Sequence, residues 1–224
     1  MNKALTIAID GPGSAGKGPV ARGVAQALSY QYVDTGAMYR AVALFSERAG
    51  IPWTDEVRVA TVARDLHFAF VWDGDALRIV VNDEDVSKSI RTAHVGKGAS
   101  DVSALPAVRA ALLELQRGLG AQGGVVMDGR DIGTVILPDS ELKVFLSASL
   151  EERARRRHEE LIRRGEVASY DDVQTQLAYR DKQDSERPIA PLKQAEDAIL
   201  VDTTDLTIPQ AIDKVLGLAL PLLA

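Results

Sequence analysis

Short apolar runs alternate with helical patterns along most of the chain. The run over residues 5–9 ends at Asp10 and Gly11, which predicts a buried strand followed by a turn. Because strands separated by helices imply a parallel sheet covered on both faces, we expect a three-layer α/β core with a five-stranded parallel sheet. The other strands are predicted over 32–33, 124–128, 142–146 and 199–202, and the helices over 20–28, 38–49, 106–119, 150–164, 171–180 and 208–218.

A segment with a different pattern of apolar residues interrupts this alternation. Residues 56–66 predict a helix, and strand-like runs follow over 67–72 and 77–81. These two runs flank Asp73-Gly74-Asp75, which is a strong hairpin signal. We interpret residues 62–98 as an insertion with antiparallel strands, and residues 1–61 with 99–224 as the core.

Composition and charge exclude several classes of protein. The 224 residues are 46% hydrophobic and 26% charged, as in ordinary globular proteins. Without cysteine, the chain has no disulfide framework, thiolate zinc site or cysteine nucleophile. The three histidines are far apart in sequence, which argues against a histidine metal site. A net charge of −6 argues against binding to nucleic acid polymers.

The chain shows no pattern for membrane insertion or secretion. Its most apolar uncharged stretch, residues 215–224, is about half as long as a bilayer span requires. The N-terminus passes directly into a strand-like run without the apolar region of a secretory signal. We therefore expect a cytoplasmic protein without a membrane partner, and a monomer is the default expectation.

A glycine-rich loop carries the first chemical signal. The loop follows a strand, precedes a helix and satisfies the pattern G-x-x-x-x-G-K, which is the context that a phosphate loop needs. Its amides and the helix N-terminus would bind phosphates, and its lysine would contact the β- and γ-phosphates of ATP. A plain glycine-rich turn is the alternative. The loop residues are Gly11, Pro12, Gly13, Ser14, Ala15, Gly16 and Lys17.

The two residues after the lysine depart from the full pattern, which ends in Ser or Thr. Gly18 and Pro19 have no hydroxyl for Mg²⁺, and Pro19 has no N–H to donate to a phosphate. Proline is sterically tolerated in the first helical turn. We therefore expect an intact loop with weakened binding of ATP and Mg²⁺.

Two further segments follow predicted strands, at the edge where open α/β sheets bind ligands. Asp34 could orient a Mg²⁺-bound water, and Thr35 and Arg40 could bind an acceptor phosphate; a helix cap at Asp34 or Thr35 is the alternative. Asp128 ends another strand, as the second acid near Mg²⁺ does in phosphate-loop proteins. Arg130 and Asp131 would point into the same crevice.

An arginine series follows later in the chain. Phosphoryl transfer spreads negative charge over oxygens that arginine can stabilise. Glutamates alternate with the first group of arginines, so we interpret most of that group as a solvated helix with i,i+4 ion pairs, with one or two arginines facing ATP. Arg180 and Arg187 flank Asp184 in a polar stretch typical of a closing segment rather than a packed helix. The first group is Arg153, Arg155, Arg156, Arg157, Arg163 and Arg164.

Taken together, these residues resemble the bacterial cytidylate kinases, of the nucleoside monophosphate kinase group. The phosphate loop is shared by many families, whereas Asp-Thr-Gly-Ala-Met-Tyr-Arg and Gly-Arg-Asp-Ile-Gly-Thr are far more specific. The resemblance implies a P-loop kinase core, a CMP-binding insertion at 62–98 and a mobile lid at about 150–190. The matching segments are 7–17, 32–40, 102–109, 128–134, 184–187 and 191–198.

The resemblance also implies substrates and roles: ATP with Mg²⁺ as donor, and CMP or dCMP as acceptor. Asp34 and Asp128 would hold the metal through water, and Lys17, Arg130, Arg180 and Arg187 would be catalytic. ATP would contact residues 11–19 and Arg157. By this resemblance, Ser100, Arg109 and Asp131 contact the cytosine edge, Thr35, Arg40 and Arg130 the CMP phosphate, Asp184 and Arg180 the sugar, and Arg187 the phosphates.

The chemistry of the base fits this assignment. Asp131 can accept from the exocyclic amine of cytosine, and Arg109 can donate to the ring nitrogen and carbonyl. Uracil reverses this pattern, so CMP should be preferred over UMP by at least about tenfold. Two alternatives stay open: a phosphate-loop kinase for UMP, AMP or a small alcohol, and a nucleotide-binding protein that Pro19 leaves with weak or no catalysis. A GTPase switch is disfavoured, because no Asn-Lys-x-Asp guanine signature is present.

Overall fold

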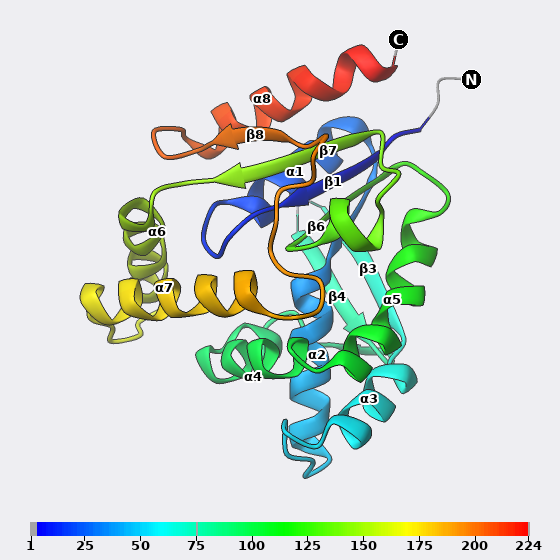
Figure 1. Cartoon of the computed structure of the whole chain (residues 1–224), viewed down its shortest axis with the longest axis vertical. Coiled ribbons are helices and arrows are strands. Elements are labelled where there is room, and N and C mark those ends of the chain that lie inside the picture. The colour runs from blue at the N-terminus through cyan, green and yellow to red at the C-terminus, as the bar shows by residue number, and fades with distance from the viewer. Residues whose placement is uncertain (1–3, 75, 224) are drawn as a thin grey trace. The chain divides into compact units, whose positions relative to one another are not determined.

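The computed structural model describes residues 4–74 and 76–223, which form two compact units (Figure 1). The first unit comprises the residues up to Tyr32 together with those from Gly123 onward, and the second comprises Val33–Gln122. The antiparallel strands lie inside the second unit. The limits 62–98 for an inserted region stay a prediction.

A five-stranded sheet carries the alternation that the sequence predicts. Its strand order is β2-β6-β1-β7-β8, and the β1–β6, β1–β7 and β7–β8 pairs are parallel. The central strand β1 is buried on both faces, so its sequence is a continuous apolar run rather than an alternating one. The expected five-stranded α/β sheet is therefore confirmed. The strands are β1 (Thr6–Asp10), β2 (Gln31–Asp34), β6 (Val125–Gly129), β7 (Leu142–Ser147) and β8 (Ile199–Asp202).

Two helices of the first unit pack on this sheet. Helix α1 (Lys17–Leu28) contacts β6, and α8 (Ile208–Ala219) contacts both α1 and β7. Helix α8 begins with a reciprocal capping box, in which Thr207 accepts from the amide of Gln210 and Gln210 accepts from that of Thr207. A short 3₁₀ turn, η3 (Leu220–Leu223), follows α8.

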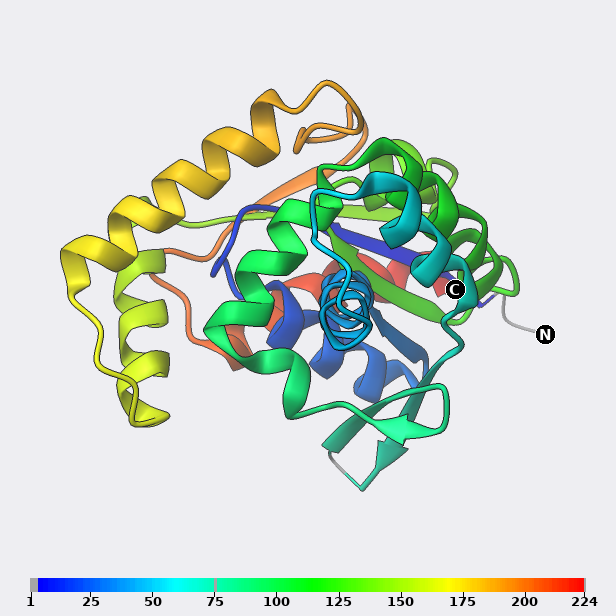
Figure 2. The same cartoon turned by 90° about the horizontal axis from the view of Figure 1, so that it is seen from below.

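Helices α6 (Leu150–Arg163) and α7 (Tyr170–Glu186) lie side by side (Figure 2). They share a small apolar cluster of Ala154, Leu161, Val173 and Leu177. The interpretation of α6 as an ion-paired helix is confirmed, since its charged residues form the pairs that i,i+4 spacing allows. These pairs join Arg156 to Glu152 at 2.7 Å, Arg155 to Glu159 at 2.5 Å, and Arg164 to Glu160.

The predicted end of α7 was wrong. The helix continues past Arg180 to Glu186, so Asp184 lies on a helix and not in an irregular closing segment. The apolar periodicity stops early, but polar contacts with other elements sustain the last turns. Asp181 pairs with Arg153 at 2.6 Å, and Asp184 with Arg130 at 2.9 Å.

The second unit is built around α2 (Thr35–Arg48), which packs against α3 (Glu56–Asp65) and α4 (Ala93–Ser103). Helix α5 (Pro106–Gly120) packs against α3. The hydrophobic pattern did not predict α4, because the buried face of this helix carries only small side chains and includes Gly98, whose helix propensity is low. Gly98 is required there by packing, since a Cβ at this position would lie 2.5 Å from the ring of Trp53.

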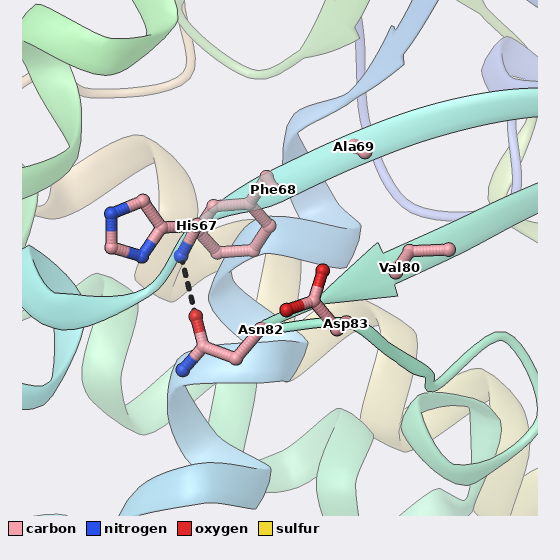
Figure 3. Close-up of a pocket in the computed structure, with 6 residues that line it drawn as sticks. All are labelled: His67, Phe68, Ala69, Val80, Asn82 and Asp83. Carbon is pink, nitrogen blue, oxygen red and sulfur yellow. Dashed lines mark hydrogen bonds between the residues drawn. The ribbon is translucent and has the colours of Figure 1, made fainter.

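A three-stranded antiparallel sheet completes the second unit. Strands β3 (Phe68–Asp73), β4 (Ala76–Val81) and β5 (Glu84–Asp85) follow the order β3-β4-β5, which confirms the predicted hairpin. Asp75, part of the predicted turn, lies outside the described residues. In the portions described, no helix is long and apolar enough to cross a membrane. A hollow of about 280 Å³ lies at one end of this sheet, lined by His67, Phe68, Ala69, Val80, Asn82 and Asp83 (Figure 3).

Candidate active site

The glycine-rich loop connects β1 to α1, as its sequence context requires. Gly11 has a φ of 147°, and a Cβ there would lie 2.0 Å from the carbonyl oxygen of Leu146. Gly16, the N-cap of α1, has a φ of 90°. Both positions need glycine, because other residues are strained in this region of φ and Gly11 has no space for a side chain.

Three side chains hold the carbonyl groups of the loop from within the first unit. Lys17 Nζ donates to the carbonyl oxygen of Pro12 at 2.7 Å. Arg153 Nη1 donates to that of Gly13 at 3.2 Å, and Thr203 Oγ1 to that of Ala15 at 3.0 Å. These bonds to the carbonyl oxygens fix the peptide planes of the loop.

Lys17 is 6% exposed, and its surroundings destabilise its charge. Burial, followed by the positive charges of Arg130 and Arg180, lowers the pKa of Lys17 to about 7, against the opposing effects of Asp128 and Asp10. The ammonium form of Lys17 is thus less stable in this buried site than in water. The negative charge of an arriving triphosphate would restore this form.

The departure from the full loop pattern lies in the first turn of α1. Pro19 is exposed in this turn, so the expected steric tolerance of proline is confirmed. Beside it, a Cβ at Gly18 would lie 3.4 Å from the hydroxyl oxygen of Tyr32. That hydroxyl donates to Asp128 Oδ1 at 2.7 Å. Tyr32 therefore orients the carboxylate of Asp128, which precedes Gly129 at the end of β6.

Arginine–carboxylate pairs join the segment after β6 to α7 within the first unit. Arg130 Nε donates to Asp184 Oδ2 at 2.9 Å, and Arg187 Nη2 to Asp131 Oδ1 at 3.1 Å. Burial by itself would raise the pKa of Asp184, but Arg130, Arg180 and Arg187 together hold it below its usual range. The Asp184 carboxylate thus stays charged, and the two pairs fix the orientation of the Arg130 and Arg187 guanidinium groups.

Arg130 also lies beside the phosphate loop. A Cβ at Gly13 would lie 3.8 Å from Arg130 Nη2. Arg157, in contrast, donates along its own helix to Glu160 at 2.8 Å. The first unit therefore brings seven of the predicted side chains together beside the loop, and Arg157 is not among them. The seven are Lys17, Asp128, Arg130, Asp131, Arg180, Asp184 and Arg187.

The predicted residues of the second unit form a separate set. Asp34 caps α2 by accepting from the amide of Ala37, so the capping alternative is confirmed for this residue. Its Oδ2 also pairs with Arg40 at 2.8 Å and Arg91 at 3.4 Å. The Asp34 carboxylate is thus fixed by the Ala37 amide and two arginines. Thr35 is the first residue of α2.

Arg109 and Ser100 lie on neighbouring helices of the same unit. Arg109 is 8% exposed, its guanidinium carbon lies 5.7 Å from the centre of the Tyr39 ring, and Nη1 donates to the carbonyl oxygen of Ser103 at 3.4 Å. Ser100 is half-buried on α4. Packing on a ring and on a helix end gives Arg109 a fixed direction.

Sequence reasoning missed several residues that support the site. Thr203, Arg91 and Asp10 were given no role, and Arg153 was only one of a series. Of these residues, only Asp10 carried a sequence signal, because an acidic residue ends the first strand immediately before the loop. The remaining contacts depend on side chains that are distant in sequence.

A phosphate loop after the central strand of a parallel sheet, with buried lysine and arginine beside it, defines a kinase of the P-loop class. Solved structures with a similar fold include a gluconokinase from Sinorhizobium meliloti 1021, with a TM-score of 0.50 and 17% identity over 100% of this chain and 95% of that one. A shikimate kinase from Acinetobacter baumannii has a TM-score of 0.50 and 15% identity, over 98% and 95% of the two chains. Identity this low shows the fold alone.

Within that class, the chain belongs to the cytidylate kinase family, whose sequence profile matches residues 7–220. A cytidylate kinase of Geobacter sp. (strain M21) is 52% identical over 209 residues, which are 93% of this chain and 90% of that relative. A cytidylate kinase of Bacillus subtilis (strain 168) is 45% identical over 216 residues, 96% of each chain. The resemblance noted in the sequence is confirmed, and the chain is a nucleoside monophosphate kinase. A nucleotide-binding protein without catalysis gains no support from these relatives.

Proposed function

We propose that the protein transfers the γ-phosphoryl group of ATP to the phosphate of CMP or dCMP, giving ADP and CDP or dCDP. Membership of the cytidylate kinase family supports this activity. The observation that carries it is the place of Arg130, which lies beside both Lys17 of the phosphate loop and Asp184 of α7. The Arg130 guanidinium group can thus stabilise the negative charge on the phosphoryl group during its transfer.

The reaction needs positioning and charge neutralisation rather than a strong base. An acceptor oxygen of the CMP phosphate is already anionic; it bonds to the γ-phosphorus as the bond to the bridging oxygen of ADP breaks. Lys17, Arg130 and Arg187 stabilise the negative charge on the oxygens of the phosphoryl group as it moves from donor to acceptor. Closure of the predicted lid around α6 and α7 would exclude water and suppress hydrolysis of ATP.

The acceptor is recognised by side chains that each unit holds in place. In the first unit, Asp131 accepts from the exocyclic amine of cytosine, and Asp184 with Arg180 binds the sugar. In the second unit, Arg109 and Ser100 contact the base, and Thr35 and Arg40 bind the phosphate. Support comes from the fixed orientation of Arg109 over Tyr39 and of Arg40 on Asp34.

Magnesium would be held with ATP rather than in a protein cage. Among residues 4–74 and 76–223, no group of three His, Asp or Glu side chains is placed to bind a metal, but a nucleotide-bound Mg²⁺ needs only one or two carboxylates beside phosphate and water. Asp128 fits, since it is an oxygen donor oriented by Tyr32 and lies near Lys17. When bound, the ion neutralises charge on the β- and γ-phosphates. Asp34 stays a prediction, and its carboxylate is occupied by Arg40 and Arg91.

An acceptor panel tests the proposal directly. Purified protein is incubated with ATP, Mg²⁺ and one of CMP, dCMP, UMP, AMP or a small alcohol, and the formation of ADP and of the phosphorylated acceptor is measured. CMP and dCMP should be the best acceptors, and Lys17→Ala should nearly abolish transfer. Equal or faster transfer to another acceptor would contradict the assignment. The monomeric state and the cytoplasmic location stay predictions from the sequence.

A further inference from the structure

The carboxylate of Asp10 holds a segment that is far away in sequence. Asp10 ends β1 immediately before Gly11, and it is 5% exposed. Its Oδ1 accepts from the amide of Ile132 and its Oδ2 from that of Gly133, both at 2.8 Å. Two short bonds to successive amides fix the position and the direction of that backbone.

Those two amides begin a helical turn, η2 (Ile132–Ile136), whose hydrogen bonds have π-type spacing. The first amides of a helical turn have no partner inside it, and an aspartate at the N-cap commonly accepts from them. Asp131 occupies the N-cap, yet its side chain makes no capping bond. Asp10 accepts from the first two amides of the turn instead.

Because Asp10 supplies the cap, the carboxylate of Asp131 is directed elsewhere. Asp131 is 4% exposed, and its Oδ1 accepts from Arg187 Nη2 at 3.1 Å. Without Asp10, the uncapped amide of Gly133 would compete for the Asp131 carboxylate, since an aspartate at the N-cap can bond to amides two or three residues onward.

We propose that Asp10 is a positioning residue for nucleotide selection: it caps η2 in place of Asp131 and thereby keeps the Asp131 carboxylate directed to Arg187 and to the pyrimidine. This inference rests on the proposed function, in which Asp131 contacts the base. Asp10 itself touches neither substrate nor reacting atoms in this scheme. Its effect on the reaction passes through Asp131.

The surroundings of Asp10 are consistent with a carboxylate that accepts at both oxygens. The pKa of Asp10 is raised to about 6, chiefly by burial and also by the charge of Asp131. The amides of Gly133 and Ile132 and the charge of Lys17 act in the opposite direction. Asp10 is therefore largely ionised at neutral pH. The Cα of Gly133 lies close to this carboxylate, since a Cβ there would lie 3.5 Å from Asp10 Oδ2.

The first test replaces one acceptor of the pair with a donor. In Asp10→Asn, the amide oxygen can still accept from one backbone amide, but its NH₂ group faces the other. The ratio of kcat/KM for CMP to that for UMP should fall about tenfold, the effect of losing one hydrogen bond to a charged group. Because Asp10 also lies near Lys17, the comparison uses this ratio, in which a change in ATP binding that is common to both acceptors cancels.

A matched control separates positioning from general stability. Asp55 also caps a helix, accepting from the amide of Arg58 at 3.2 Å, and it lies in the second unit at the start of α3. Asp55→Asn should lower the melting temperature and leave the CMP-to-UMP ratio unchanged. If Asp10→Asn also leaves that ratio unchanged while lowering the melting temperature, Asp10 is merely structural and the proposal is overturned.

A double-mutant cycle tests whether Asp10 acts through Asp131. In a background of Asp131→Asn, the further change Asp10→Asn should alter the CMP-to-UMP ratio less than about twofold, because residues that act as a unit are not additive. A second full tenfold loss would show independent effects and would overturn the proposal. Kd values for CMP from calorimetry give the same comparison without turnover.

A second variant keeps the test decisive if Asp10→Asn does not fold. Asp10→Ser leaves a neutral acceptor that is too short to bond both amides at once, and it should lower the CMP-to-UMP ratio in the same direction. An unchanged ratio in a folded Asp10→Ser protein would count against the proposal. The unsubstituted enzyme separates the two hypotheses: if it shows no preference for CMP, the proposed function fails, whereas a preference that survives the variants removes only the role of Asp10.

Discussion

Arg153 on α6 donates to the carbonyl oxygen of Gly13 at the tip of the phosphate loop, over 3.2 Å. The same Nη1 lies 2.6 Å from Oδ2 of Asp181 on α7, and Nε donates to the carbonyl oxygen of Ala148 at 3.0 Å. One buried guanidinium group therefore links the loop to both helices of the predicted lid. The conformation of the loop and the docking of α7 on α6 depend on the same side chain.

Replacing this arginine should weaken donor binding. Arg153→Met keeps much of the apolar packing but removes three hydrogen bonds, so kcat/KM for ATP should fall at least about tenfold, with a loss of about 2–3 kcal/mol in the free energy of unfolding. Steady-state kinetics at saturating CMP and urea denaturation measure the two effects. Arg155→Met is the matched control, because Arg155 is exposed on the same helix; equal losses in both variants would refute the link.

Restoring the end of the phosphate loop should strengthen binding of ATP. Pro19→Thr returns an N–H donor and a hydroxyl ligand for Mg²⁺, so the Kd for ATP with Mg²⁺ should fall about tenfold. Pro19→Ala returns the N–H alone and should improve binding equally with and without Mg²⁺. Calorimetric titrations with the ion and with a chelator measure both effects. Unchanged affinity and turnover in Pro19→Thr would show that the missing groups are not limiting.

Binding of ATP should be coupled to proton uptake at Lys17. Burial and nearby arginines lower the pKa of this lysine to about 7, so much of it is neutral at pH 8, and bound phosphates should raise the pKa again. Calorimetry at pH 8 in buffers of different ionisation enthalpy should then give different binding enthalpies, and Lys17→Met should remove most of the difference. Buffer-independent enthalpies for the unsubstituted protein would contradict the coupling.

The same lysine should affect the stability of the ligand-free protein. Its pKa is lower in the folded than in the unfolded chain, so the unfolded chain binds more protons between about pH 7 and 10.5. The contribution of Lys17 to the free energy of unfolding therefore rises with pH across this window. Denaturation midpoints of Lys17→Met and the unsubstituted protein, compared at pH 7 and 9, isolate the contribution. The free energy of unfolding of the unsubstituted protein should rise relative to that of Lys17→Met as pH increases, and an unchanged or falling relative value would contradict the lowered pKa.

Removing the carboxylate of Asp131 should impair CMP more than UMP. Asp131→Ala removes the acceptor for the cytosine amine, so kcat/KM for CMP should fall at least about tenfold further than that for UMP. Arg187 also loses a partner, which should lower transfer to both acceptors. Asp139→Ala, an exposed change after η2, is the control and should leave both values unchanged. Equal losses on CMP and UMP would refute contact with the base.

Local sequence determined the elements whose signals lie within a few residues. The apolar run before Gly11 and the glycines that follow it specify a strand and a loop with left-handed residues, because these conformations depend on local sterics. The alternation of strands and helices likewise specified the parallel sheet. The helix Ala93–Ser103 escaped this reasoning, since Gly98 is placed by the ring of Trp53 and not by helix propensity.

Only the tertiary structure decided which side chains support the site. Asp10 caps a turn 123 residues away, and Arg153 contacts a loop 140 residues away. Such contacts exist because β1 and β6 pair in parallel, which places Asp10 opposite Gly129 and next to the segment that follows. A periodic pattern reports which face of an element is buried, but hydrogen bonds between distant residues follow from strand order and register. The reactive groups could therefore be read from sequence, and their positions could not.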